Sequence, residues 1–174
     1  MGKKIANDKH QKAPMNKNTK NLVYALAGSV FLVMAILIII ENTPNKLIVK
    51  NKTGKNLEYV KAYFVDDEGQ LTKAIEIKDL KIGETAEFDL EKLYLTNLEA
   101  VFEIRFKFEG YDELFTDTGY FNDVFDGKIT ISFTDTDNDK VLLNVKATTG
   151  ILTNPNIICD EEYTVNLEEG YVEE

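Results

Sequence analysis

The chain has 174 residues, with 30 Asp and Glu against 20 Lys and Arg and a formal net charge of −10. This acidity, with Arg105 as the sole arginine, argues against nucleic-acid binding, which needs clustered Lys and Arg against phosphate. A single cysteine, Cys159, excludes an internal disulfide framework, and the heavy use of Lys, Asn and Ile suggests an AT-rich bacterial genome.

Residues 1–21 form a basic tail, in contrast to the acidic remainder of the chain. Its charged side chains are Lys3, Lys4, Lys9, Lys12, Lys17, Lys20 and Asp8. Positive charge in a short tail beside a membrane span favours the cytoplasmic side, so we expect a cytoplasmic N-terminus. Binding of anionic lipid head groups or of nucleic acid is an alternative role for these lysines.

An uncharged apolar run begins at Leu22 and ends at Ile40. At ~1.5 Å per residue it spans roughly 28 Å, close to the ~30 Å hydrocarbon core of a bilayer. The run is longer than the core of a secretory signal peptide, and Cys159 is too distant to serve as a lipoprotein anchor. The sequence therefore predicts one transmembrane helix over residues 22–41, in contact with membrane lipid, in a single-pass protein of the cell membrane.

Residues 42–150 are predicted to form an extracytoplasmic β-domain. The clearest strand covers residues 100–109, where Ala100, Phe102, Ile104, Phe106 and Phe108 fall on one face and charged residues on the other. Further strands are expected at residues 47–51, 57–65, 71–77, 85–90, 111–116, 128–133 and 141–146, the last two forming a hairpin. Residues 90–98 are alternatively compatible with a helical turn.

Seven or eight short strands at intervals of about 8–12 residues predict an all-β fold, an immunoglobulin-like antiparallel β-sandwich preceded by the single N-terminal transmembrane helix. The chain has no Trp and no cysteine pair. The immunoglobulin-like assignment therefore rests on architecture alone.

Residues 151–174 form an acidic C-terminal segment with no basic residue. The alternation of Tyr163, Val165 and Leu167 is compatible with one further strand, whereas the end from Glu168 is expected to be solvated. Cys159 is expected to be a buried or unpaired thiol.

Side chains for nucleophilic catalysis are scarce. His10 is the only histidine and lies in the tail, while Ser29 and Ser132 are the only serines. A Ser-His or Cys-His pair therefore cannot assemble in the β-domain, and we expect no enzyme and no organic cofactor. A pair of carboxylates remains an alternative source of chemistry.

The loop of residues 134–140 carries Asp135, Asp137 and Asp139, whose oxygen atoms suit Ca²⁺. The EF-hand pattern fails because Lys140 and Lys146 stand at the positions of its turn glycine and bidentate glutamate. Two interpretations stay open: a calcium site formed by the three aspartates, or a turn without metal, which Asp and Asn favour on their own.

A second acidic group is formed by Asp117, Asp123 and Asp126. We expect that it can reach the same end of the sandwich as the 134–140 loop.

Two classes of function follow. The favoured one is a membrane-anchored binding or scaffolding module with an unknown protein partner, serving as an accessory subunit of a bacterial envelope, surface or secretion assembly. The alternative is a membrane-tethered enzyme that uses a carboxylate pair on an envelope polymer. An exposed sheet edge or apolar patch would favour the first, and two facing acids among aromatic side chains the second.

Overall fold

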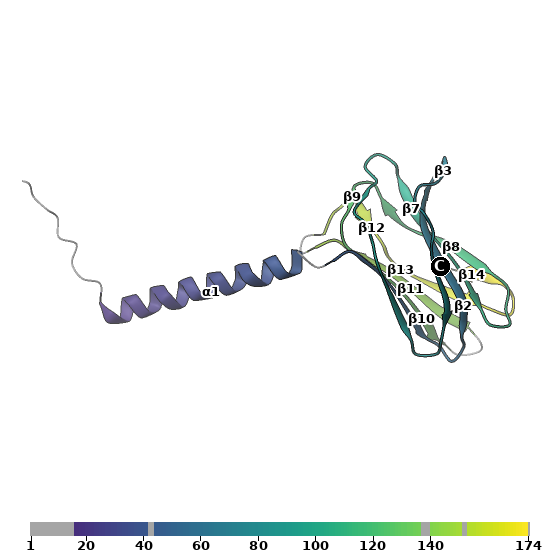
Figure 1. Cartoon of the computed structure of the whole chain (residues 1–174), viewed down its shortest axis with the longest axis horizontal. Helices are drawn as coiled ribbons and strands as arrows, with labels where there is room; N and C mark the ends of the chain where they lie inside the picture. The colour runs from purple at the N-terminus through teal and green to yellow at the C-terminus, as the bar shows by residue number, and fades with distance from the viewer. Residues whose placement is uncertain (1–15, 42–43, 137–139, 151–152, 174) are drawn as a thin grey trace, which may run out of the picture. The chain divides into compact units, whose positions relative to one another are not determined.

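The structure is a computed structural model that describes residues 16–41, 44–136, 140–150 and 153–173. The chain divides into two compact units, residues 1–39 and residues 40–174. The first unit contains all but the last two residues of the helix α1, and the second contains the β-domain (Figure 1).

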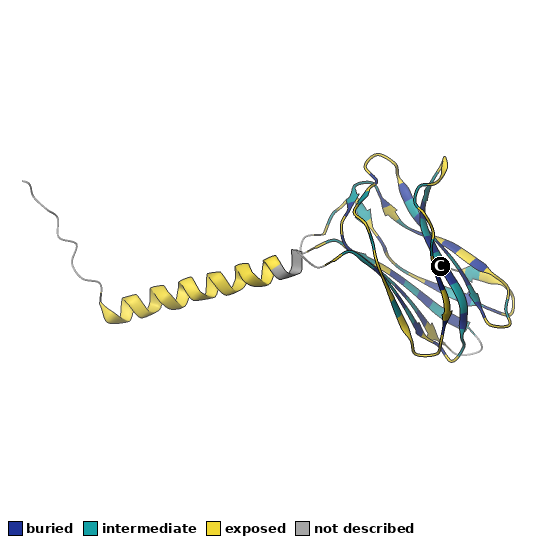
Figure 2. Cartoon of the chain, viewed as in Figure 1, coloured by how far each residue is buried: buried dark blue, intermediate teal, exposed yellow. Residues whose placement is uncertain are grey.

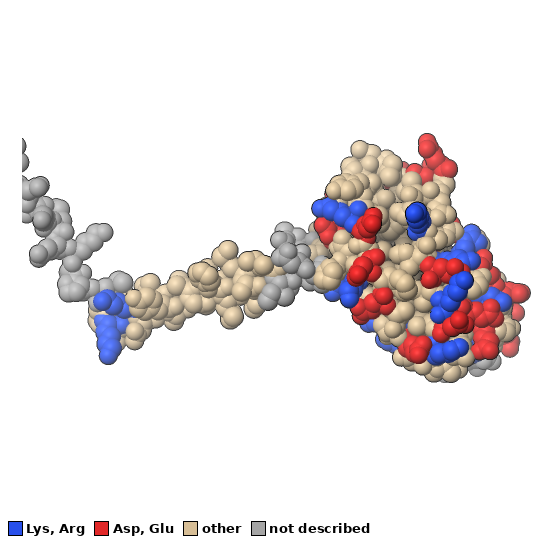
Figure 3. All heavy atoms as spheres, in the orientation of Figure 1, with Lys and Arg blue, Asp and Glu red and all other residues tan. Residues whose placement is uncertain are grey.

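Helix α1 covers Lys17–Glu41, and its described side chains are all exposed (Figure 2). The segment Lys17–Ile38 has a mean hydropathy of 2.3, so it is long and apolar enough to cross a membrane. The helix starts ahead of Leu22 because Asn16 caps it: the Asn18 N–H donates to Asn16 Oδ1 at 3.3 Å, and the Lys20 N–H donates to the Asn16 carbonyl at 2.9 Å. After Lys17 and Lys20, the rest of the helix carries no basic side chain (Figure 3).

The β-domain contains two large sheets. Sheet A has six strands in the order β14-β13-β11-β10-β1-β5. Their bounds are β1 Lys46–Lys52, β5 Thr85–Asp89, β10 Lys128–Asp135, β11 Lys140–Thr148, β13 Asp160–Asn166 and β14 Tyr171–Glu173.

Sheet B has the order β12-β8-β7-β2, and both β3 and β4 pair with the other edge of β2. Its strands are β2 Leu57–Asp66, β3 Gly69–Gln70, β4 Ile75–Leu80, β7 Ala100–Phe108, β8 Leu114–Phe121 and β12 Ile157–Ile158. The chain passes repeatedly between the two sheets, as from β1 to β2 and from β4 to β5.

A third, two-stranded sheet joins β6 (Leu93–Tyr94) to β9 (Val124–Phe125). It brings Phe125 into the core, where the side chain is fully buried against Phe121 with ring centroids 5.5 Å apart. A helical turn over residues 90–98 is therefore wrong: this stretch contains β6, followed by a turn that the Leu98 N–H closes on the Leu95 carbonyl at 3.1 Å.

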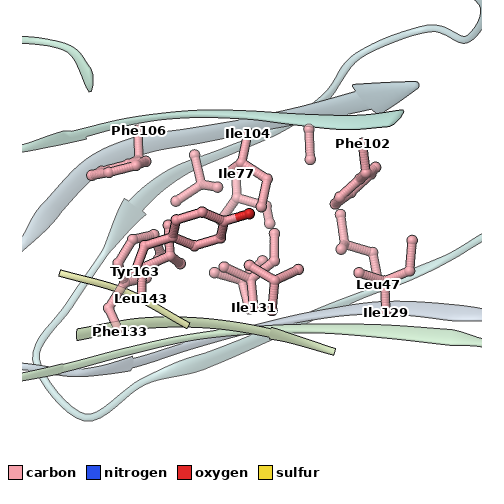
Figure 4. Close-up of a cluster of buried hydrophobic side chains, with 14 of the residues drawn as sticks. Leu47, Ile77, Phe102, Ile104, Phe106, Ile129, Ile131, Phe133, Leu143 and Tyr163 are labelled. Atoms are coloured by element: carbon pink, nitrogen blue, oxygen red, sulfur yellow. The ribbon is translucent and has the colours of Figure 1, made fainter. Parts of the chain in front are cut away.

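The two large sheets share one apolar core, so the β-domain is a sandwich (Figure 4). Phe133 of β10 meets two aromatic rings of β7 across the interface, Phe106 at 5.1 Å and Phe108 at 5.6 Å between centroids. All three side chains are fully buried. Burying one such side chain contributes about 1.5–3 kcal/mol, so these cross-sheet contacts hold the layers together.

An all-β domain after one N-terminal apolar helix is confirmed. Strand β7 alternates buried and half-buried residues from Ala100 to Phe108 as predicted, and β10 and β11 form the expected hairpin. One pairing differs from the expected antiparallel sandwich: β1 pairs with β10 in parallel, Leu47 opposite Ile129, whereas the other described pairings are antiparallel. The two strands are far apart in sequence, so no short turn forces them to be antiparallel.

The first prediction concerns independent folding. A fragment that begins at Asn45 should give a β-type far-UV spectrum and one cooperative urea transition, because the β-domain has its own core. Phe133→Ala should lower its free energy of unfolding by about 3–5 kcal/mol. Phe115→Ala, at a side chain that is 55% exposed, is the control and should cost less than about 1 kcal/mol. A helical spectrum, or the absence of a transition, would contradict the fold.

Candidate functional site

The aspartate loop is described only in part. Asp135 lies at the end of β10, where its Oδ2 accepts a hydrogen bond from the Gly54 N–H at 2.5 Å. Asp137 and Asp139 lie outside the described residues. The calcium site at Asp135, Asp137 and Asp139 therefore stays a prediction, and within the described ranges no three His, Cys, Asp or Glu side chains are grouped to hold a metal ion.

Asp135 supports a turn that other side chains also organise. Asn51 is fully buried and its Nδ2 donates to the Lys55 carbonyl at 2.8 Å and to the Leu80 carbonyl at 3.1 Å. Its Oδ1 accepts hydrogen bonds from the backbone N–H and the hydroxyl of Thr53. Asp135 thus has a structural partner in the adjacent 53–55 turn, which favours the interpretation without metal.

The second acidic group does not gather beside the 134–140 loop. Strand β10 runs from Lys128 to Asp135, so Asp126 and Asp135 stand at opposite ends of one strand, separated by roughly 25–30 Å at ~3.3 Å per residue. Asp123 precedes β9 near the Asp126 end, where its Oδ2 accepts from Asn154 Nδ2 at 3.0 Å. Asp117 lies in the middle of β8, so the expectation that these three acids reach the same end of the sandwich as the loop is wrong.

The outer face of sheet B carries a polar network around Arg105. Its Nε donates to Glu103 Oε1 at 2.6 Å and to the Tyr63 hydroxyl at 2.9 Å, and its Nη1 contacts Glu113 Oε1 at 3.2 Å. The guanidinium also lies 5.0 Å from the centroid of the Phe115 ring. These hydrogen bonds, first those with Tyr63 and Glu103, raise the pKa of Arg105 and fix its planar group on the sheet.

Two carboxyl groups are cross-strand neighbours on the same face. Glu103 of β7 stands opposite Asp117 of β8. Partial burial, and then the negative charge of Glu103, raise the pKa of Asp117 above its ordinary value. Glu103 itself is already engaged, because it accepts hydrogen bonds from Arg105 and from the Tyr63 hydroxyl.

A third arrangement closes one side of the sandwich. The chain leaves β12 of sheet B at Cys159 and enters β13 of sheet A, where Glu161 points toward sheet B. Glu161 accepts hydrogen bonds from the Thr118 hydroxyl at 2.7 Å, from the Gly119 N–H at 3.1 Å and from the Tyr163 hydroxyl. Burial raises the pKa of this carboxyl, but the hydrogen bonds from the three donors lower it by more. The pKa of Glu161 therefore lies below its ordinary value.

Gly119 is required at this crossing. Its φ is +70°, and a Cβ there would lie 2.7 Å from the Cys159 Cβ and 2.8 Å from a ring atom of Phe121. Cys159 is a free, buried thiol as expected, and burial raises its pKa to about 11. The thiol therefore fills space where the chain changes sheets.

The opposite side of the sandwich is open. Here β4 of sheet B and β5 of sheet A are the edge strands, joined by the short 81–84 connection. Away from that connection lies a groove of about 490 Å³. Its apolar lining is formed by Ala62, Phe64, Ile75, Leu90, Leu93 and Phe102, and its exposed charged side chains are Lys73, Asp89 and Glu91.

Phe88 marks the open side most clearly. It pairs with Leu47 of β1, which is fully buried, so the two side chains lie on the same, inward face of sheet A. Phe88 is nevertheless 37% exposed, because in the described part of the chain no strand of sheet B covers it. Exposed inward-facing apolar side chains beside a groove are typical of a binding surface. We call this groove, together with the adjacent edge of β5, the β5 groove.

The sequence predicted only part of these arrangements. The alternation of Ala86, Phe88 and Leu90 indicated their inward direction but not that the opposing layer stops short of them. The position of Arg105 on the polar face of its strand was predicted, but its partners Tyr63 and Glu113 come from other strands. Glu161 lies in an acidic stretch of the sequence. The one indication that its side chain points inward was its spacing of two residues from Tyr163 and four from Val165, which alternate on the buried face.

No protein-family model matches this chain, and no curated protein matches it in sequence. Among solved structures, it is similar to a protein from Eubacterium rectale determined by NMR, with 11% sequence identity and a TM-score of 0.38. The match covers 64% of this chain and 95% of that one. A similarity at this level carries no weight for function.

The second prediction concerns Glu161. Glu161→Gln should destabilise the 45–174 fragment at pH 7 by about 1–3 kcal/mol, since a charged acceptor of three donors is lost. Because the folded-state pKa of Glu161 is lowered, its stabilisation is present above the ordinary value near 4.5 and is lost as pH falls through the lowered value. The variant should therefore lose less stability than the native fragment between pH 6 and pH 3.

Urea titrations at several pH values check this prediction. Glu162→Gln, at the exposed neighbouring residue, is the matched control. Equal pH dependence in the Glu161→Gln and native fragments would contradict the role of Glu161.

The third prediction separates the two interpretations of the aspartate loop. If Asp135 only supports the turn, Asp135→Asn should cost about 1 kcal/mol of stability, with or without calcium. Calcium should leave the melting temperature of the native fragment unchanged. A bound ion would instead add about 2.7 kcal/mol at a hundredfold excess over Kd, and Asp137→Ala would remove that gain. Such a calcium-dependent shift would contradict the turn interpretation.

Proposed function

We propose that this protein is a single-pass, membrane-anchored binding or scaffolding module whose β-domain lies outside the cytoplasm. In this proposal it is an accessory subunit of a bacterial envelope, surface or secretion assembly. The observation that carries the proposal is the β5 groove, where an exposed sheet edge borders an apolar groove. Exposed edges and grooves are the usual places where β-domains take an extended protein segment.

The anchor part of the proposal rests on α1. Its apolar segment suits a bilayer, and the lysines of residues 1–21 favour a cytoplasmic tail. Four residues, 42–45, lie between α1 and β1 in the sequence.

The immunoglobulin-like identity of the sandwich is also proposed. It is supported by two facing sheets and by connections that pass repeatedly from one sheet to the other. The parallel pairing of β1 with β10 is compatible with a first strand that has joined the sheet of the later strands.

The Glu103 and Asp117 pair favours a second candidate, an enzyme of carboxylate chemistry on an envelope polymer. The raised pKa of Asp117 suits a general acid, and Tyr59, Tyr63 and Phe115 lie on the same face. Binding is preferred because Arg105 and Tyr63 already occupy Glu103. Hydrolysis of purified cell-wall polymer by the native chain, lost in Asp117→Asn, would reverse this preference.

The fourth prediction concerns topology. In spheroplasts, a membrane-impermeant maleimide should label Lys78→Cys, whose native side chain is 65% exposed, but should label Lys4→Cys only after permeabilisation. The native chain is the control, because Cys159 is buried and its raised pKa of about 11 disfavours the reactive thiolate. The reverse labelling pattern would contradict an extracytoplasmic β-domain.

Partner binding is tested by photo-crosslinking in the cells that make the protein. A photoreactive amino acid in place of Phe88 should give a discrete crosslinked product. Replacement of Ile82, which is 57% exposed on the 81–84 connection, should not. No product at Phe88, or the same product at both positions, would argue against a binding module that uses this surface.

A further inference from the structure

The outer edge of β5 offers unpaired backbone groups. The Leu90 N–H donates to the Asn45 carbonyl, and the Glu84 carbonyl accepts from the Asn51 N–H, both at 2.9 Å. Backbone groups of alternate residues point the same way in an antiparallel pair, so those of Ala86 and Phe88 also face β1. The N–H and C=O groups of Thr85, Glu87 and Asp89 therefore point away from β1, and no strand pairs with them within the described residues.

The side chains of β5 divide between two faces in the same alternation. Ala86 and Phe88 share the inward face with Val49 and Leu47, and the groove begins directly after them, at Asp89 and Leu90. Glu87 points outward, where it contacts Lys46 at 2.5 Å. A strand added to this edge would place every second side chain on the inward face beside Phe88, next to the groove at Leu90, and the others on the outward face beside Glu87.

The charge of this edge decides the chemistry of the added strand. Residues 84–91 contain Glu84, Glu87, Asp89 and Glu91 and no basic residue. Lys46 pairs with Glu87, and Lys73 lines the groove, so acidic side chains outnumber basic ones at this edge by a smaller margin than the strand alone shows. Opposite charges across neighbouring strands stabilise a sheet, whereas like charges directly opposite destabilise it. A second copy that paired symmetrically through β5 would bring Glu87 opposite Glu87 in the register centred on Glu87, and opposite Asp89 in the register centred on Phe88, so homodimer formation in these registers is disfavoured.

We propose that the β5 edge takes up an extended segment of a partner protein, in which apolar side chains that enter the groove alternate with Lys or Arg. This inference rests on the proposed binding function and specifies the partner segment. The added strand would complete sheet A at its open edge and cover Phe88. Main-chain hydrogen bonds would supply affinity, while the groove and the acidic edge would select the sequence.

The test uses the full chain in phosphatidylcholine nanodiscs and a fluorescent synthetic peptide of about nine residues in which Val and Lys alternate. A peptide of the same composition, with Val and Lys in two blocks, controls for attraction to the acidic protein. At about 0.15 M salt, anisotropy should show binding of the alternating peptide and at least about tenfold weaker binding of the block peptide. Equal binding of both peptides, or no binding of either, would overturn the proposal.

Variants of Glu87 separate strand pairing from charge. Glu87→Pro removes an outward N–H but none of the hydrogen bonds to β1, and proline is tolerated at such edge positions. It should reduce affinity by about tenfold or more, whereas Glu87→Gln, which removes the charge and the ion pair with Lys46 but keeps the N–H, should reduce it by about threefold or less. Native affinity in Glu87→Pro would overturn the proposal. Should Glu87→Pro fail to fold, Thr85→Pro, at the first residue of the strand, tests the same point.

A second pair of variants tests the groove. Phe88→Ala should weaken binding of the alternating peptide by about tenfold, since an apolar contact is lost. Phe115→Ala, also at an exposed phenylalanine but on the outer face of sheet B, should leave the affinity unchanged. Equal loss in both variants, or dimers of the native chain that Glu87→Pro dissociates, would overturn the proposal. A photo-crosslink at Phe88 without binding of the alternating peptide would support the proposed binding function. It would overturn the proposal that the partner supplies an extended segment of alternating apolar and basic residues.

Discussion

The structure depends on the burial of aromatic side chains between two sheets. Phe106 and Phe108 of one sheet meet Phe133 of the other, and at the β9 end of the core Phe64, Phe121 and Phe125 pack together. This contact fixes the separation of the two sheets but does not cover the apolar core where the sheets end at their edge strands. The two pairs of edge strands differ in how this part of the core is covered.

One side is closed by the chain itself. At Cys159 the backbone passes from sheet B to sheet A, Gly119 leaves room for it, and Glu161 ties β13 to β8 through Thr118 and Gly119. Among the described residues, the other side is bridged at its edge strands by the short connection from β4 to β5. Away from it the layers leave a groove, and Phe88 keeps an inward direction without an opposing layer. The asymmetry explains why an apolar surface and an unpaired edge occur together at β5.

Local patterns in the sequence predicted the local structure. The alternation from Ala100 to Phe108 predicts which face of β7 is buried. The apolar run after Lys20 predicts the apolar part of helix α1. The pairing of distant strands was not predictable in this way. Asp126 and Asp135 are near in sequence yet stand at opposite ends of β10, and β1 lies parallel to a strand about eighty residues away. The β5 groove depends on such distant pairings. The alternation around Phe88 therefore predicted which face of the strand its side chain lies on, but not that the side chain is exposed.

Amide hydrogen exchange of the full chain tests most directly whether the β5 edge is an unoccupied binding edge. In the purified protein, the amides of Thr85, Glu87 and Asp89 should exchange fast, whereas those of Ala86 and Phe88, which face β1, should be protected. In membranes from the cells that make the protein, the three outward amides should become protected as a partner strand adds to them. Slow exchange of the outward amides in the purified chain, or fast exchange in both preparations, would contradict the account.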